Sequence, residues 1–156
     1  MKETIEERLS IIKELEKIDI DSIVSLLKEI IISGNTIFWC GNGGSASQAD
    51  HLSAELLGRF KKNRSPYASH SLIPNSSLIT CISNDFGYEN IFSRQLEGIA
   101  KSGDACALIS TSGTSQNILN AYEICKKKGI KTLLFLGNVI DPIYEDSEII
   151  ISIPGI

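Results

Sequence analysis

Residues 36–46 read Thr-Ile-Phe-Trp-Cys-Gly-Asn-Gly-Gly-Ser-Ala, a short apolar run that ends in a glycine-rich turn. The β-branched and aromatic residues of 36–40 are typical of a strand. The polar and apolar residues that follow the glycines have the spacing of a helix, which we expect to run on through Phe60. A strand that passes into a helix through glycines is the opening of a β-α unit, so this stretch predicts an α/β fold.

Four further runs along the chain have the same β-type composition: residues 67–72, 105–109, 130–136 and 148–153. Segments of helical period or glycine-rich turns separate them, and strands that alternate with helices pair in parallel. The apolar runs at 107–109 and 132–136 do not alternate, as expected of strands covered by helices on both faces. We therefore predict a three-layer α/β sandwich around a five-stranded parallel sheet.

Two amphipathic helices are expected ahead of this sheet. Their apolar stripes are Ile5, Leu9, Ile12 and Leu15, then Ile20, Ile23, Val24, Leu27, Ile30 and Ile31. Asp19 or Asp21 caps the start of the second helix and Gly34 its end. Such a pair either folds onto the α/β unit or packs against a second subunit, and we favour an oligomer. No repeat or linker divides the chain, so we assign one domain over 1–156, with a helical pair at 1–34 and an α/β core at 35–156.

Composition and charge exclude several classes of protein. The chain has 156 residues, of which 42% are hydrophobic and 22% charged, values that fit one folded core and not a disordered or membrane protein. A net charge of -4 and a pI near 5.2 leave no basic field for a nucleic-acid backbone. The N-terminus is too charged for a signal peptide and no segment is long enough to cross a bilayer. The four cysteines form no C-x-x-C pair, so neither a disulfide framework nor a thiolate zinc site is indicated, and we expect a cytoplasmic protein.

The glycine loop, Gly41 to Ala46, predicts a ligand site. Its backbone N–H groups and the N-terminus of the helix that it opens favour an anionic or polyhydroxyl ligand. The loop also satisfies the dinucleotide pattern G-x-G-x-x-A. That interpretation needs an acidic residue about twenty positions further on, at the end of the second strand, where residues 69–74 contain none. A tight turn that binds nothing is the remaining alternative.

The hydroxyl loop, Ser110 to Ser115, comes before a helix that we expect over 116–128. Several small hydroxyls at a helix N-terminus give side-chain and backbone donors to one phosphate, so we predict a phosphate site without a lysine. The alternative is helix capping by Ser112 or Ser115, which uses one hydroxyl and leaves the others unexplained.

Two pairs of polar residues are candidates for chemistry. His51 and Glu55 are four residues apart on one helix face, a spacing that suits a metal, although a surface hydrogen bond or an ion pair of Glu55 with Arg59 also explains it. Asn84 and Asp85 either bind sugar hydroxyls, hold a catalytic group, or form an Asx turn that caps a helix starting near residue 89. His70, inside a predicted strand, receives no role.

Four motifs taken together resemble the SIS-domain phosphoheptose isomerases: Gly-Asn-Gly-Gly-Ser-Ala at 41–46, His-Leu-Ser-Ala-Glu-Leu-Leu-Gly-Arg-Phe at 51–60, Asn-Asp-Phe-Gly at 84–87 with Phe-Ser-Arg-Gln at 92–95, and Ser-Thr-Ser-Gly-Thr-Ser at 110–115. The match spans nearly the whole chain. The resemblance implies a flavodoxin-like sandwich that assembles as a homotetramer and binds zinc. It implies conversion of sedoheptulose 7-phosphate to D-glycero-D-manno-heptose 7-phosphate in bacterial heptose biosynthesis, which supplies lipopolysaccharide or capsule.

The same resemblance implies roles for individual residues. The sugar would be contacted by Asn42, Gly43, Gly44, Asn84 and Asp85, and the phosphate by Ser110, Thr111, Ser112 and Ser115. His51 and Glu55 would bind zinc. Glu55 would also touch the substrate and act as the catalytic base that moves a proton between C1 and C2.

The sequence departs from the family pattern near its end. Family members continue past the last strand into a helix whose glutamine and histidine complete the metal site, and the chain, which stops at 153–156, has no counterpart of this helix. Residues 137–142 also differ from the family's glycine-rich turn. The alternative function is a non-catalytic SIS module that binds a sugar phosphate or associates with the replication initiator DnaA. Such relatives usually depart from the motifs at 84–87 and 110–113, which are intact here, so the isomerase is favoured.

Overall fold

The computed structural model describes residues 2–137 and 142–153. The helices are α1 (Lys2–Leu15), α2 (Ile20–Ile32), α3 (Gly44–Leu57), α4 (Ser76–Phe86), α5 (Ser93–Ile99) and α6 (Gln116–Lys128), with short 3-10 helices η1 (Tyr88–Asn90) and η2 (Pro142–Tyr144). The strands are β1 (Ile37–Gly41), β2 (Ser69–Ser71), β3 (Ala105–Ser110), β4 (Lys131–Leu136) and β5 (Ile149–Ser152). All five predicted strands are present, and the helix expected over 116–128 has those bounds.

The five strands form one parallel sheet in the order β2-β1-β3-β4-β5. This is the flavodoxin-like order that the family resemblance implied. The chain leaves β1 toward β2 on one side and returns to β3 on the other, so the strand order reverses between β1 and β3. In such sheets a crevice opens at that point, outside the carboxyl ends of the strands. A ligand site is therefore expected at the loops after β1 and β3.

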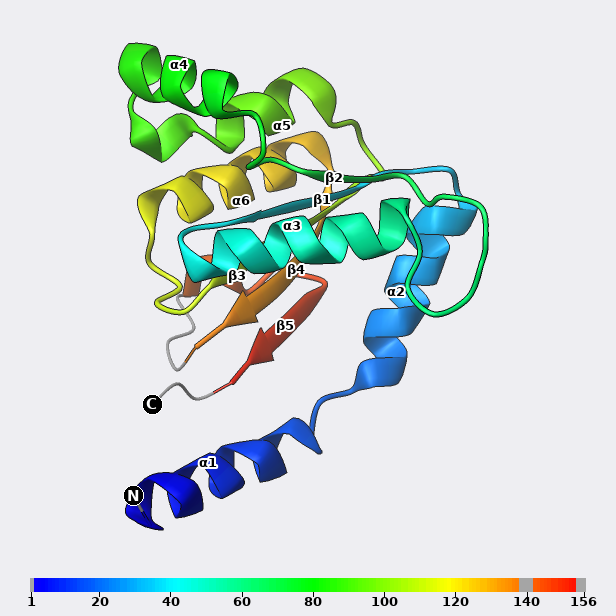
Figure 1. Ribbon diagram of the computed structural model, residues 1–156. Coiled ribbons are helices and arrows are strands. Elements are labelled where there is room, and N and C mark those ends of the chain that lie inside the picture. The colour runs from blue at the N-terminus through cyan, green and yellow to red at the C-terminus, as the bar shows by residue number, and fades with distance from the viewer. Residues whose placement is uncertain (1, 138–141, 154–156) are drawn as a thin grey trace.

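Helices cover both faces of the sheet, as predicted (Figure 1). Side chains alternate along β1, so Ile37 and Trp39 pack in one cluster with α2 and α3, while Phe38 and Cys40 pack in the other with α4, α5 and α6. Trp39 also donates its indole N–H to Ser69 at 2.9 Å, which ties β1 to β2. The three-layer sandwich is confirmed.

Two predicted helix boundaries were wrong. The helix after the glycine loop ends at Leu57 and not at Phe60, because Gly58 takes a backbone conformation that stops it (ψ −114°) and donates its N–H to Ala54. Residues 83–86 are the last turn of α4, where the sequence indicated a polar turn. Asn75 caps the start of α4 by accepting the N–H of Leu78 at 3.0 Å, and the helix continues through these residues until Gly87 ends it with φ +89°.

The two N-terminal helices differ in how they meet the sheet. Asp19 caps α2. Its carboxylate accepts hydrogen bonds from the hydroxyl and the backbone N–H of Ser22, and these bonds lower the pKa of Asp19. α2 then packs on the sheet through Ile30, and Gly34 follows its end with φ +71°. The apolar stripe of α1, in contrast, is 40% to 55% exposed, and Figure 1 shows this helix standing away from the sheet. The sequence left open whether the two helices fold onto the α/β unit or pack against a second subunit. α2 folds onto the α/β unit.

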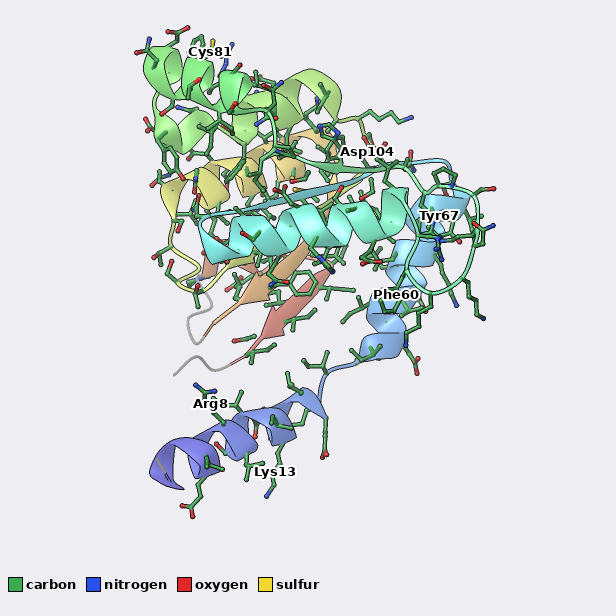
Figure 2. All side chains as sticks on the ribbon, viewed as in Figure 1. Arg8, Lys13, Phe60, Tyr67, Cys81 and Asp104 are labelled. Atoms are coloured by element: carbon green, nitrogen blue, oxygen red, sulfur yellow. The ribbon has the colours of Figure 1, made fainter. Side chains whose placement is uncertain are left out.

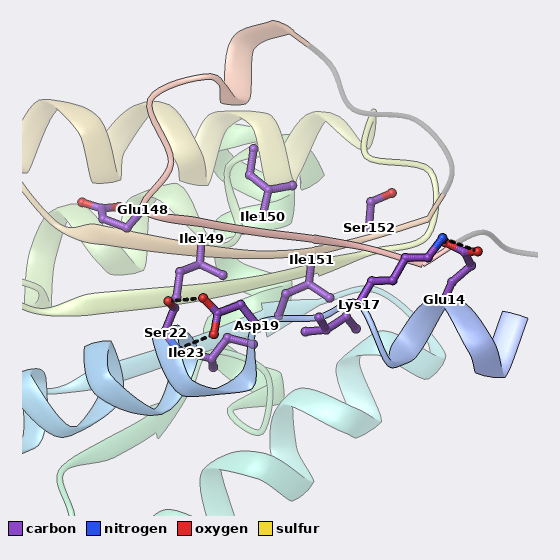
Figure 3. A pocket seen from close by; sticks show the side chains of 11 residues that line it. Glu14, Lys17, Asp19, Ser22, Ile23, Glu148, Ile149, Ile150, Ile151 and Ser152 are labelled. Atoms are coloured by element: carbon purple, nitrogen blue, oxygen red, sulfur yellow. Dashed lines mark hydrogen bonds and ion pairs between the residues drawn. The ribbon is translucent and has the colours of Figure 1, made fainter.

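A groove of about 410 Å³ separates the α1–α2 connection from β5 (Figure 3). β5 pairs with β4 and forms the edge of the sheet. An ion pair between Lys17 and Glu14 (2.7 Å) lies at one end of the groove. The groove is lined by the β5 edge and the start of α2, so it is separate from the loops after β1 and β3.

The four cysteines are free thiols. Cys40, Cys106 and Cys125 are buried in the core, and Cys81 is exposed on the outer side of α4 (Figure 2). The pKa of Cys125 lies above its ordinary range because its thiol hydrogen-bonds to Cys106 and is buried. Among the described residues, no helix is both long and apolar enough to cross a bilayer.

Candidate functional site

The glycine loop and the hydroxyl loop lie next to each other because they follow the adjacent strands β1 and β3. Ser45, from the start of α3, lines one pocket of about 210 Å³ together with Ser110 and Thr111. The pocket therefore lies at the carboxyl ends of β3 and β4 beside the start of α3, where backbone N–H groups lack helical partners and attract an anion. The two loops that the sequence singled out separately form one site.

The hydroxyl loop is held in shape by its own side chains. Ser110 Oγ accepts the N–H of Gly113 at 3.2 Å, and Ser112 Oγ accepts the N–H of Thr114 at 3.3 Å. From outside the loop, the buried Tyr144 donates its hydroxyl to the Gly113 carbonyl at 2.7 Å. These bonds fix the loop before any ligand arrives, as a preorganised phosphate site requires.

The capping alternative for this loop fails at Ser115. Ser115 occupies the N-cap position of α6 but makes no side-chain capping hydrogen bond. Ser112 bonds within the loop, to Thr114, and not to the helix. The hydroxyl of Ser115 is therefore available to a ligand at the helix N-terminus.

Gly137 closes the far side of this pocket. Its N–H donates to the carbonyl of Thr111 at 3.1 Å, which joins the end of β4 to the hydroxyl loop. A Cβ built at Gly137 would lie 2.2 Å from that carbonyl oxygen, closer than any contact a side chain tolerates. Only glycine fits between β4 and the loop. The rest of the divergent turn, residues 138–141, lies outside the described residues.

The glycine loop is shaped by two of its glycines. Gly43, just before α3, has φ +54°, which favours glycine, and a Cβ at Gly41 would lie 2.8 Å from the backbone of Ser45. The Asn42 side chain points to α6, where it hydrogen-bonds with Asn117. Of the three glycine-loop residues expected to contact the sugar, Asn42 is hydrogen-bonded within the protein through its side chain, while Gly43 and Gly44 offer backbone groups only.

His51 and Glu55 lie on one face of α3 as predicted. His51 Nε2 is 3.4 Å from Glu55 Oε1, with the two side chains 70% and 31% exposed. The other carboxylate oxygen of Glu55, Oε2, is buried and has no hydrogen-bond partner among the described residues. A buried carboxylate oxygen without a partner is costly unless something binds it. The alternative ion pair of Glu55 with Arg59 does not form; instead Arg64 donates to the Glu55 backbone carbonyl at 2.7 Å.

These two side chains fit zinc as a partial ligand set. Imidazole nitrogen and carboxylate oxygen are both zinc donors, and the partnerless Oε2 is free to take up a cation. Zinc sites generally use at least three protein ligands. Residues 2–137 and 142–153 contain no cluster of three or more histidine, cysteine, aspartate or glutamate side chains that could hold a metal ion.

One chain does not bring Glu55 to the hydroxyl loop. Glu55 lies eleven positions along α3 from Gly44, which at about 1.5 Å per residue places it roughly 16 Å from the loops. α3 runs back from the carboxyl edge of the sheet, so Glu55 lies toward the opposite edge (Figure 1). A seven-carbon sugar phosphate held in the hydroxyl loop is too short to reach it.

Asn84 and Asp85 are exposed in the last turn of α4. They hydrogen-bond to each other at 2.8 Å, and Asp85 accepts the thiol of Cys81 at 3.6 Å. The alternative of an Asx turn that caps a helix near residue 89 does not apply, because Gly87 precedes η1 and no side chain caps that short helix. A second pocket, of about 240 Å³, lies between the glycine loop and Tyr88. Within the described part of the chain, neither Asn84 nor Asp85 lines this pocket or the pocket beside Ser45.

Sequence reasoning missed four residues of this site: Ser45, Tyr88, Asn117 and Tyr144. Ser45 stands inside the quoted glycine loop, and its place after Gly44 could have identified it. Tyr88 and Asn117 contact Asn42, and Tyr144 contacts the hydroxyl loop, all from positions distant along the chain. No local pattern marks them, because their function depends on tertiary contacts.

Known proteins share both the sequence and the fold. A family model described as the SIS domain matches residues 2–137. The chain is 40% identical over 137 residues to a phosphoheptose isomerase from Akkermansia muciniphila, covering 88% of this chain and 72% of that protein. It is 49% identical over 109 residues to a phosphoheptose isomerase from Nitratiruptor sp., covering 70% of this chain and 58% of that protein. Among solved structures, phosphoheptose isomerase GmhA from Neisseria gonorrhoeae matches with a TM-score of 0.87 and 28% identity, over 99% of this chain and 84% of that one.

Proposed function

Because the chain belongs to the phosphoheptose isomerases of the SIS-domain family, we propose that it interconverts sedoheptulose 7-phosphate and D-glycero-D-manno-heptose 7-phosphate. One observation carries this proposal. The hydroxyl loop and the glycine loop meet at the point where the strand order reverses, and they contribute Ser110, Thr111 and Ser45 to one pocket beside the start of α3. That arrangement suits a phosphorylated polyhydroxyl compound.

The phosphate would be held by the hydroxyl loop. Ser110, Thr111, Ser112 and Ser115 supply hydroxyls, and the first turn of α6 supplies backbone N–H groups and a positive dipole end. Binding of the remote phosphate orients the sugar and contributes to catalysis without touching the reacting carbons. Gly43 and Gly44 would donate backbone N–H groups to the sugar, with Asn84 and Asp85 as its further contacts.

Glu55 would act as the base. Exchange between a ketose and an aldose removes a proton from the carbon beside the carbonyl and returns it to the neighbouring carbon through an enediolate. A carboxylate that does this must be able to accept a proton and release it again within the site. The carboxylate oxygen Oε2 of Glu55 has no hydrogen-bond partner within the described chain, which supports this role.

The separation of Glu55 from the hydroxyl loop supports assembly from several copies. Because about 16 Å of helix lies between them, a complete site needs Glu55 from one subunit and the loops from another. Uncovered apolar side chains on the N-terminal helices provide surface for such contacts: Ile5, Leu9, Ile12, Ile20 and Ile32. We propose a homotetramer, because its closed symmetry buries the same apolar surface of every subunit against a neighbour.

Zinc would be held by His51 and Glu55. When bound, such an ion polarises a substrate oxygen and stabilises negative charge that develops on it. Two protein donors are fewer than zinc sites generally use, so at least one further donor must come from outside the described residues or from the sugar. Glu55 cannot hold a metal with both carboxylate oxygens and still accept a proton. To act as the base, it would have to leave at least one oxygen free of the metal.

Turnover of sedoheptulose 7-phosphate tests the proposal. The full chain, incubated with this sugar phosphate and zinc, should yield the aldose, detected by NMR of the anomeric protons. Removal of metal with a chelator should lower the rate about 10-fold or more, and zinc should restore it. Binding of the sugar phosphate without turnover would reject the isomerase and favour the non-catalytic SIS module. Failure to bind it at all would reject the isomerase and the sugar-phosphate-binding module, and would leave the module that associates with DnaA.

A further inference from the structure

Asn117, in the first turn of α6, is buried, with 2% of its surface exposed. Its side-chain amide makes two hydrogen bonds, and both go to the same partner. Asn42 Nδ2 donates to Asn117 Oδ1 at 2.9 Å, and Asn117 Nδ2 donates to Asn42 Oδ1 at 2.8 Å. This reciprocal amide pair joins the glycine loop after β1 to the helix that the hydroxyl loop opens.

A third group completes this cluster. The hydroxyl of Tyr88, in η1, donates to Asn42 Oδ1 at 2.9 Å. An amide oxygen has two lone pairs, so the bonds from Asn117 and Tyr88 use the full acceptor capacity of Asn42. Asn42 is therefore fixed from two directions, by α6 and by η1. Rotation of its side chain would leave the buried Asn117 amide unsatisfied, which is strongly unfavourable.

The cluster sets the spacing between the two halves of the site. The glycine loop begins α3 and the hydroxyl loop begins α6, and the amide pair is a direct side-chain link between them. A change in that spacing would shift the backbone N–H groups of Gly43 and Gly44 relative to a phosphate held by the hydroxyl loop. Misplacement of about 1 Å can lower catalysis by about 100-fold.

We propose that Asn117 is a positioning residue for the reaction: through Asn42, and with Tyr88, it holds the glycine loop at the distance from the hydroxyl loop that the bound sugar phosphate requires. This inference rests on the proposed isomerase function. Asn117 itself faces Asn42 and acts on the substrate only through the glycine loop.

A double-mutant cycle tests this proposal on the full chain. Asn42→Ala, Asn117→Ala and the double variant are compared by kcat and KM for sedoheptulose 7-phosphate. Each single variant should lose about 10- to 100-fold in kcat/KM. The double variant should lose no more than the more severe single variant, because both remove the same link. The loss should fall mainly on kcat, with KM changed less than about 3-fold, since the hydroxyl loop still anchors the phosphate.

Two further variants keep the test decisive. Tyr88→Phe removes one hydroxyl from a residue that is 54% exposed, so it folds even where Asn117→Ala does not. It should lower kcat a few-fold, and this loss should disappear in the Asn42→Ala background. Gln116→Ala is the matched control, because this exposed amide in the same turn bonds to Asn120 and not to the glycine loop, and its kinetics should equal those of the unaltered chain.

The outcomes distinguish failure of the positioning role from failure of the proposed isomerase function. An unaltered chain that turns over the sugar phosphate, together with additive losses in the cycle or an unchanged kcat for Asn117→Ala, would overturn the positioning role alone. A lowered melting temperature with unchanged kcat would show that the amide pair serves stability only. An unaltered chain without turnover would overturn the proposed function and this inference with it.

Discussion

The Glu55→Gln variant is expected to lose about 1,000-fold in kcat for sedoheptulose 7-phosphate, within the range that general base catalysis contributes. Glutamine has the size of glutamate, so the backbone bond from Arg64 to residue 55 and the fold of α3 remain. What disappears is the carboxylate whose buried Oε2 lacks a partner. An amide cannot take a proton from the sugar. KM should change little, because in the proposed site the hydroxyl loop, and not Glu55, holds the phosphate.

Metal loss has to be separated from loss of the base. The variant is assayed at saturating zinc, and its bound metal is measured by elemental analysis beside that of the unaltered chain. Glu123→Gln, which neutralises an exposed carboxylate on α6, is the matched control and should retain full activity. If Glu55→Gln kept kcat within about 3-fold of the unaltered chain, Glu55 would not be the base.

The second large effect is expected from Gly137→Ala. The added Cβ would lie 2.2 Å from the Thr111 carbonyl oxygen, so β4 and the hydroxyl loop must move apart and the bond from Gly137 N–H to that oxygen must lengthen. We expect KM for the sugar phosphate to rise at least about 10-fold. Overpacking of this kind also costs about 1–3 kcal/mol of unfolding free energy, which urea denaturation measures.

Gly98→Ala provides the comparison. Gly98 lies in α5 with no atom within 4 Å of the position a Cβ would take, so alanine fits there. Alanine in place of a helical glycine is expected to raise the unfolding free energy by about 0.5–1 kcal/mol and leave KM unchanged. A Gly137→Ala variant that bound the sugar phosphate as well as Gly98→Ala does would contradict the placement of the phosphate beside Thr111.

The sheet and the two loops were predictable because their signals are local. Four of the strands are marked by short apolar runs, while β2 reads Ser-His-Ser, and the parallel arrangement follows from the alternation of strands with helices. The glycine loop and hydroxyl loop each stand directly after a strand, so their common edge followed from the fold class. The 116–128 helix was predicted to the residue, since the hydroxyl loop precedes it and Gly129 with φ +67° ends it.

The parts that could not be predicted depend on tertiary packing. The spacing of His51 and Glu55 showed that they share a helix face, but only the direction of α3 showed that this face ends far from the hydroxyl loop. Asn84 and Asp85 looked like a turn because their side chains favour turns, yet α4 ends only at Gly87, which has φ +89°, and therefore includes them. α1 carries the same apolar pattern as α2, and nothing in that pattern says which of the two stripes the sheet covers.

Crystals of the full chain soaked with sedoheptulose 7-phosphate would test the central claim most directly. The account predicts phosphate density within hydrogen-bond distance of Ser110, Thr111, Ser112 and Ser115, with the sugar extending past Gly43 and Gly44. Phosphate density elsewhere, for instance in the groove beside β5, with the hydroxyl loop unchanged and empty, would contradict it.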